Sequence, residues 1–171
     1  MSETPVSLHP AAFGVLASTH GALRSLLASL PASALETPGA EGWSPKDVVA
    51  HILSIEQQAL LGRVRLIVDA NDAAIANIDE DATLAASGMR AWPIARLLDE
   101  FAVRRSAALE NLSRLGPEEL ARSGNHSAAG AVSAADVVHH VAFHDLLHIG
   151  QITQLICAPI EERRGAMRMF R

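Results

Sequence analysis

Residues 134–156 read AADVVHHVAFHDLLHIGQITQLI, and this stretch constrains the fold more than any other part of the chain. It runs for about six helical turns without proline, and Ser133 before it is a favourable N-cap residue. His140, His144 and His148 recur at every fourth position. A helix places residues with that spacing one above another on the same face. The pattern therefore predicts a long helix with a row of three imidazoles along one side.

The histidine row is expected to point into the protein. The other residues on its face are mostly apolar: Val137, Val141, Gln151 and Leu155. A buried imidazole needs a partner for each ring nitrogen, and a transition metal accepts lone pairs from two imidazoles one turn apart. With a rise of ~1.5 Å per residue, His140 and His148 start about 12 Å apart, whereas metal–nitrogen bonds are about 2.0–2.1 Å long. One ion can take His140 with His144, or His144 with His148, and another helix must supply a third ligand.

A second helix offers that ligand at His51. Its start is marked by the sequence Gly-Trp-Ser-Pro, with Ser44 as N-cap and Pro45 at the first helical position. The face of His51 also carries Val48, Ile55, Gly62 and Leu66. His51 is therefore expected to point toward a core. Asp47 lies one turn before His51, where it would either accept a hydrogen bond from the far ring nitrogen or be a solvated acid of the helix start.

Four long amphipathic segments predict the architecture. They span residues 10–30, 44–69, 93–115 and 134–157, and apolar residues recur along each at helical spacing. The expected core positions of the first and third are Phe13, Leu16, Leu23, Leu27, Leu30, Ile94, Leu97, Leu98, Phe101, Ala108, Leu112 and Leu115. Apolar residues make up 49% of the chain but aromatic residues only 4%, and the dominance of alanine and leucine favours helices over sheets. We expect one all-α domain over residues 1–171, folded as a four-helix bundle.

The segments between these helices are interpreted as connections. Residues 31–42 are rich in turn-forming residues, and residues 71–91 form a long polar link with a short helical turn at 82–87. Residues 117–123 predict one extra helical turn, and residues 124–133 a loop. His126 in this loop is expected to be exposed, the alternative being a position at the mouth of a site. Long connections in a compact domain are often functional lids or crossovers.

Several other side chains are expected to have no chemical role. His20 is interpreted as a surface or capping histidine of the first helix. Arg104 and Arg105 are expected on the solvent-exposed face of the third helix, where a charged side chain usually does no more than interact with water. Cys157 is expected to be a small core residue, because no basic residue lies beside it to activate its thiol.

Charge and cysteine content restrict the partners and the compartment. The formal net charge is −5, which argues against nucleic acid as a partner. A single cysteine excludes an intramolecular disulfide and suits a reducing compartment. The sequence shows neither a signal-peptide pattern nor an uninterrupted apolar run of about 18 residues. We therefore expect a soluble cytoplasmic protein without a membrane partner.

The segments GWSPKDVVAHI and, about ninety positions later, HVAFHDLLHIGQI together resemble the DinB-like (YfiT-like) superfamily. The resemblance covers most of the chain in helix order. It implies an up-down-down-up four-helix bundle, commonly dimeric, with a divalent ion, usually zinc or nickel, on three protein ligands. Carried over to this sequence, those ligands are His51, His144 and His148, with His140 as a neighbour. Some relatives have Glu at one ligand position of the last helix, where this chain has His144.

The resemblance implies two activities, a thiol S-transferase that uses a small thiol and a hydrolase-like enzyme. Three imidazoles would leave a position open on the ion, as catalytic sites do. No general base is evident: Asp145 is expected to flank the site or reach solvent, and Gln151 to hydrogen-bond a ligand or a ring nitrogen. The alternatives are a non-catalytic module that binds a metal and a small ligand, and a plain scaffold whose histidines pack the core. A second apolar stripe on residues 134–157 would pack a neighbouring helix or another subunit, as in a homodimer; its members are Val138, Ala142, Ile149 and Ile156.

Overall fold

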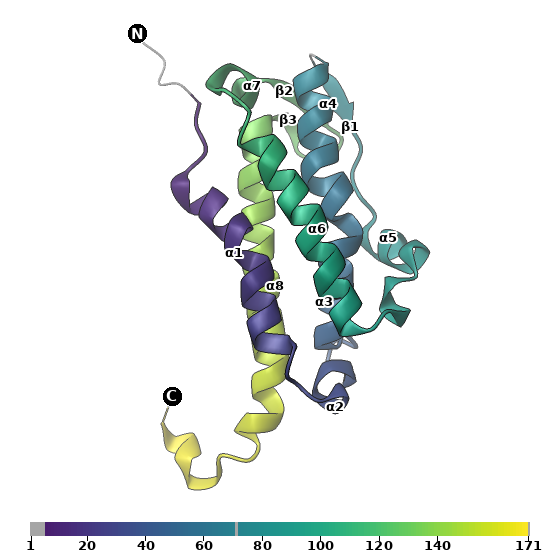
Figure 1. The fold of residues 1–171 in the computed structure, drawn as a ribbon, viewed down its shortest axis with the longest axis vertical. Coiled ribbons are helices and arrows are strands. Elements are labelled where there is room, and N and C mark those ends of the chain that lie inside the picture. The colour runs from purple at the N-terminus through teal and green to yellow at the C-terminus, as the bar shows by residue number, and fades with distance from the viewer. Residues whose placement is uncertain (1–5, 71, 171) are drawn as a thin grey trace.

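The structure is a computed structural model, and it describes residues 6–70 and 72–170. Its main body is the predicted four-helix bundle (Figure 1). The four members are α1 (Pro10–Leu27), α3 (Pro45–Glu56) with its continuation α4 (Arg63–Asp69), α6 (Ile94–Leu112) and α8 (Ala134–Glu161). In Figure 1, α3–α4 and α6 run in one direction while α1 and α8 run in the other, which is the up-down-down-up arrangement. Among the described residues, no helix is long and apolar enough to cross a membrane.

Two of the helix starts follow directly from the sequence. Ser44 and Ser133 are N-caps whose hydroxyls accept hydrogen bonds from the backbone N–H groups of Asp47 and Asp136. Each aspartate in turn accepts from the backbone N–H of its serine, which completes a capping box. The last helix is longer than predicted, since it continues through Pro159 to Glu161. A proline this close to the helix end removes only one backbone hydrogen bond, so the final turn survives.

The core consists of the positions that helical spacing selects. Eight of the twelve expected core residues in the first and third helices are buried: Leu16, Leu23, Leu27, Leu97, Leu98, Phe101, Ala108 and Leu112. The other four pack partly buried against the core: Phe13, Leu30, Ile94 and Leu115. On α8, Val138 and Ala142 are buried in the same core, and Ile149 and Ile156 pack against it. The second stripe of α8 therefore packs neighbouring helices of the same chain.

The phase of the second helix changes between α3 and α4. Residues Gln57–Gly62 form a π-helical segment, η1, which is wider than an α-helix and shifts the following residues around the axis. Gly62 and Leu66 were expected on the inner face with His51, and that prediction is wrong. Leu66 is 43% exposed, while Ile67 is fully buried and Arg63 lines a cavity. The inner face beyond the π-turn is therefore displaced by one residue.

A small sheet replaces two of the expected loops. Its strands are β1 (Ala73–Ile75), β2 (Ser123–His126) and β3 (Gly130–Ser133), in that order, with β1 parallel and β3 antiparallel to β2. The segment 124–133 is thus a hairpin, and part of 71–91 is a strand. Gly124 is required for this pairing, because a Cβ atom there would lie 2.8 Å from the carbonyl oxygen of Ala73.

Short helices occupy most of the remaining connections. They are α2 (Ala32–Glu36), α5 (Glu80–Ser87), the 3₁₀ turn η2 (Met89–Ala91), α7 (Pro117–Ala121) and, near the C-terminus, the 3₁₀ turn η3 (Gly165–Met169). The extra turn predicted at 117–123 is confirmed by α7, and the turn predicted at 82–87 is part of the longer α5. In Figure 1, α5 lies beside α3, on the return path from the end of α4 to the start of α6.

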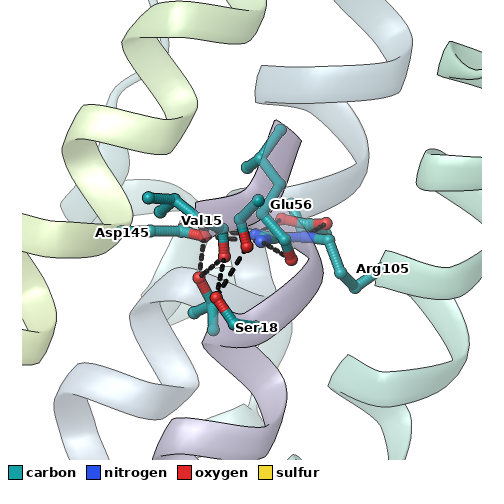
Figure 2. A network of polar contacts seen from close by, with 8 residues as sticks. Val15, Ser18, Glu56, Arg105 and Asp145 are labelled. Carbon is teal, nitrogen blue, oxygen red and sulfur yellow. Dashed lines mark hydrogen bonds and ion pairs between the residues drawn. The ribbon is translucent and has the colours of Figure 1, made fainter. Parts of the chain in front are cut away.

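A buried arginine crosses the centre of the bundle (Figure 2). Arg105 is 2% exposed, so the prediction that it lies on the solvent-exposed face of α6 is wrong. Its guanidinium donates to both carboxylate oxygens of Glu56, at 2.6 and 2.8 Å, to both of Asp145, and to the carbonyl of Leu16 at 3.0 Å. Thr19 also donates to Asp145, at 2.7 Å. One side chain of α6 thereby joins all three other long helices.

The environment of this group explains why it stays charged. Burial alone would lower the pKa of Arg105, but the hydrogen bonds and charges of Glu56 and Asp145 outweigh burial and raise it. Asp145 is fully buried in this network, so it neither reaches solvent nor flanks the histidines with a free carboxylate. Arg104, by contrast, is partly exposed and pairs with Glu100 along the helix surface, as expected for a solvating charge.

The outer face of α8 exposes several apolar side chains. Phe143, Leu146 and Leu147 are each more than half exposed, and they lie on the side of the helix away from the core. Cys157 is also exposed, so its expected place in the core is wrong. The reason is that α8 extends past the other helices at its C-terminal end, as Figure 1 shows, and its last turns have little to pack against.

Candidate metal centre

Three histidines meet between α3 and α8. His51 comes from α3, and His144 and His148 come from successive turns of α8. One ring nitrogen from each lies within 4.8 Å of the other two. The ring centroid of His51 is 5.5 Å from that of His144 and 4.7 Å from that of His148. His140 is outside this group, with its ring centroid 6.3 Å from that of His144.

His51 is the least satisfied member of the cluster. It is 2% exposed, and neither of its ring nitrogens has a hydrogen-bond partner among the described residues. The indole of Trp43 contacts its ring edge-on, with centroids 5.3 Å apart. A buried polar group without a partner costs about 1–3 kcal/mol. Two such nitrogens on a single buried ring therefore indicate that a further group belongs beside it.

The tautomer of His148 is fixed by a neighbour. Its Nδ1 lies 2.8 Å from Oε1 of Gln151, which can only accept a hydrogen bond, so Nδ1 carries the proton. The lone pair of His148 is then on Nε2, which faces Nε2 of His144 at 3.0 Å. The prediction that Gln151 hydrogen-bonds a ring nitrogen is confirmed. Gln151 directs the lone pair of His148 toward the centre of the cluster, as partners of metal-binding histidines do.

Burial keeps two of the rings uncharged. It lowers the pKa of His51 to about 4, assisted by the nearby ring of His148 and opposed by Asp81. It also lowers the pKa of His144 to about 4, with a further contribution from His148. Both are therefore neutral at physiological pH, the form that offers a lone pair to a metal. The donor set fits a divalent transition ion: tetrahedral nitrogen ligands are roughly 3.4 Å apart, a spacing that small side-chain rotations would reach here.

Of the two roles considered for Asp47, a partner of His51 or an acid of the helix start, it has the second. Its carboxylate accepts hydrogen bonds from the backbone N–H and hydroxyl of Ser44, at 3.0 and 2.7 Å, and lies 3.7 Å from the guanidinium of Arg90. It makes no hydrogen bond to His51. Asp47 is thus an acid of the helix start, and it stabilises α3 instead of orienting the histidine.

Glu80 is a site residue that the sequence reasoning missed. Its carboxylate lies 3.5 Å from Nε2 of His51, and its side chain is half exposed. It stands at the start of α5, where Asp79 is the N-cap. The only signal in the sequence was the acidic run Asp79–Asp81, which is far from His51 along the chain. The carboxylate comes close to the histidines only because the segment between α4 and α6, which contains α5, folds back beside α3.

Two hollows adjoin the cluster. One, of about 540 Å³, is lined by Trp43, His51, Glu80, His148 and Gln151 among others. The other, called here the apolar cavity, has a volume of about 340 Å³ and reaches His144 and Glu80. His126 and His140 also line the apolar cavity. His126 therefore lies beside a site, which was the alternative to an exposed position in the loop.

His20 is half-buried near the surface and accepts a hydrogen bond from Arg24, consistent with a structural role.

A four-helix bundle that brings together one buried and two partly buried histidines, two of the three uncharged, defines a class of candidate metal-binding proteins. Residues 16–152 match the family model of the DinB superfamily, and the chain belongs to that superfamily. Among solved structures the chain is similar to YfiT from Bacillus subtilis, described as a probable metal-dependent hydrolase with an unusual four-helix bundle topology. The TM-score is 0.78 at 20% identity, covering 91% of this chain and 90% of that chain, a likeness that shows the fold. A comparison with curated proteins returns no match.

Proposed function

We propose that this protein is a metal-dependent hydrolase in which His51, His144 and His148 hold one divalent ion, zinc or nickel. The observation that carries the proposal is the pair of ring nitrogens on buried His51 that have no hydrogen-bond partner among the described residues, together with ring nitrogens of His144 and His148 within 4.8 Å. The similarity to YfiT, itself described as a probable metal-dependent hydrolase, supports the same reaction class. Imidazole ligands suit both ions.

The residues around the cluster are suited to hydrolysis. A divalent ion bound by three nitrogens would polarise a carbonyl group or lower the pKa of water toward about 7. Glu80 lines both hollows and is half exposed, so its carboxylate can accept a proton from a water molecule in either one. Gln151 holds the His148 ring in one tautomer, and Trp43 closes one side of His51.

Metal content is the first test. Protein purified without a histidine tag and reconstituted with zinc or nickel should hold close to one ion per chain by elemental analysis. His51→Ala and His144→Ala should lose the ion, whereas His140→Ala should keep it with near-normal affinity. Less than about 0.2 ion per chain in the wild-type protein would leave the scaffold alternative, in which the histidines only pack the core.

Turnover is the second test. The zinc-loaded protein should hydrolyse members of a panel of small esters and amides, and Glu80→Gln should lower the rate by about 10²-fold or more while keeping the ion. Glu118→Gln, an exposed acid in the first turn of α7, is the matched control. A rate seen only when a low-molecular-weight thiol and an electrophile are supplied would assign the thiol S-transferase activity instead. A bound ion without turnover in either assay would indicate a non-catalytic binding module.

For the assembly, we propose a homodimer that covers the exposed apolar side chains of α8. Phe143, Leu146 and Leu147 form a contiguous patch on one face of this helix, and such a patch marks an interaction site in soluble proteins. A self-complementary helix face suits a two-fold interface. Light scattering after size exclusion should give twice the chain mass, and Leu147→Glu should give the monomer mass with the helical circular dichroism unchanged.

A further inference from the structure

The apolar cavity has a defined chemical character. Its walls consist largely of aliphatic side chains from α3, the segment before α5, β3 and α8, namely Ile52, Ile55, Ile78, Val132, Val137 and Val141. Its volume of about 340 Å³ is within the range of small-molecule sites. At one end it reaches His144 of the candidate metal centre. A ligand in this cavity would therefore place an apolar body next to the histidine cluster.

Three basic side chains also line the cavity. They are Arg63 at the start of α4, His126 on β2 and His140 on α8. Their mutual proximity shows in the electrostatics of His126, whose pKa is lowered by burial and further by the charges of Arg63 and His140. Nδ1 of His126 accepts hydrogen bonds from the backbone N–H groups of Ala128 and Ala129. Nε2 of a neutral His126 ring must then carry the proton and act as a donor.

Arg63 is the cation in this group whose guanidinium has a buried N–H without a hydrogen-bond partner among the described residues. Its Nη2 donates to the carbonyl of Ala76 at 3.2 Å, but its buried Nε has no hydrogen-bond partner among the described residues. Burial lowers its pKa, while the charge of Glu80 acts in the opposite direction. No carboxylate lies within ion-pair distance of Arg63 among the described residues, in contrast to Arg105. A guanidinium with a buried, unused donor is well suited to a carboxylate.

The acidic residues around the cavity are already engaged. Glu56 and Asp145 are neutralised by Arg105, and Asp136 accepts the backbone N–H of Ser133 in the capping box. The carboxylate of Glu80 lies 3.5 Å from Nε2 of His51. The negative charges that line the cavity thus leave Arg63 available for an anion from outside.

The π-turn η1 is what presents Arg63 to the cavity. In a continuous α-helix Gly62 would share the face of His51 and Ile55, and Arg63 would lie farther round. The wider turn at Gln57–Gly62 shifts the register by one residue, so that Arg63 follows Ile55 and Ala59 along the cavity wall. π-Turns occur frequently at functional sites, where they re-aim one side chain.

We propose that the apolar cavity binds a small organic carboxylate, with its carboxylate on Arg63 and its apolar body along the aliphatic wall toward His144. The inference rests on the proposed function, because it names the substrate class of the same site. It assigns Arg63 as the residue that selects for negative charge and places the reactive part of the substrate between Arg63 and the histidines. Nε2 of His126 is a further donor among the residues that line the cavity.

A matched pair of probes tests the charge selection. 3-Phenylpropionate and 3-phenylpropionamide have nearly the same shape, and only the first carries a charge. Calorimetric titration of the wild-type protein should show binding of the carboxylate about tenfold or more tightly than of the amide, the ratio expected from a charge-assisted hydrogen bond. Arg63→Gln should reduce this ratio to about twofold or less. Arg65→Gln, an exposed arginine two residues along that bonds Asn111, should keep it.

The titrations are done on protein loaded with zinc and on protein stripped by a chelator. Persistence of the charge preference without the ion supports the role of Arg63. The inference is overturned if the amide binds as tightly as the carboxylate, if neither probe binds, if the preference survives Arg63→Gln, or if it disappears on removal of the ion, since the carboxylate would then sit on the metal. Failure of the proposed function is separate, because it appears as a lack of bound ion or of turnover while the titrations still give a result.

Discussion

Replacement of Arg105 by leucine tests the buried network most directly. The substitution removes five hydrogen bonds and leaves the carboxylates of Glu56 and Asp145 facing each other without a counter-charge, at 3% and 0% exposure. Loss of one partner from a buried ion pair costs about 3–5 kcal/mol. Unfolding free energies of whole domains are about 5–15 kcal/mol, so this single change would consume a large share of the stability.

The assay is chemical and thermal unfolding followed by circular dichroism. For a protein of this size each kcal/mol shifts the melting temperature by about 2–4 °C, so Arg105→Leu should melt about 6–20 °C lower than the wild type. Arg105→Lys should fall between the two, because an ammonium keeps the charge but cannot bond both carboxylates in the same geometry. Arg104→Leu, on the surface one position away, is the control and should change stability by less than about 0.5 kcal/mol.

A double variant separates the charge from the packing. Adding Glu56→Gln to Arg105→Leu removes one uncompensated carboxylate, and the pair should recover part of the lost stability. Additive losses in the double variant would show that the loss in Arg105→Leu comes from packing. If Arg105→Leu costs less than about 1 kcal/mol, the network does not stabilise the bundle and the reasoning fails.

Three further predictions concern the cluster and the sheet. Burial holds the pKa of His51 near 4 in the folded, metal-free protein, whereas in the unfolded chain this imidazole has its ordinary pKa of 6.5. As the pH falls below 6.5, the unfolded chain therefore binds a proton at His51 that the folded protein does not bind. The contribution of His51 to stability should therefore fall by about 2 kcal/mol between about pH 7.5 and pH 5, and His51→Gln should abolish this part of the pH dependence in denaturant titrations while leaving the similar part that comes from His144. Chelation should lower the melting temperature of zinc-loaded protein by about 8–16 °C, because an ion at a thousand times its Kd adds about 4 kcal/mol. An unchanged scanning-calorimetry trace would contradict binding by the folded site. Gly124→Ala should cost about 1–3 kcal/mol because its Cβ would meet the Ala73 carbonyl, whereas Gly21→Ala, with nothing within 4 Å, should stabilise by about 0.5–1 kcal/mol in the same melts.

The histidine cluster could be anticipated from local sequence because its members obey helical periodicity. His144 and His148 are one turn apart on α8, and His51 lies on an apolar face behind a strong N-terminal capping pattern. Helix spacing alone left open which pair of α8 histidines would meet His51. The family resemblance favoured the second pair, and the structure places that pair beside His51.

Other features depend on interactions between distant segments. Arg105 is one position from a surface arginine, and nothing in the local pattern shows that Glu56 and Asp145 will meet it from other helices. The π-turn changes the phase of a helix whose sequence reads as continuous, so Leu66 was assigned to the wrong face. The strands are only three or four residues long and lack a clear alternation, so their pairing could not be recognised before the chain was folded.

The parallel course of α3–α4 and α6 has a consequence for the symmetry of the bundle. Neighbouring antiparallel helices need a link of only about 2–8 residues, and links this short would not cover any of the four sides of a bundle. Here the link between Ala70 and Pro93 must retrace the length of the molecule, and it lays β1 and α5 against one flank. Because α6 runs parallel to α3–α4, the link that holds β1 and α5 covers one side of the bundle. The carboxylate of Glu80 reaches the histidines because it belongs to this covering segment.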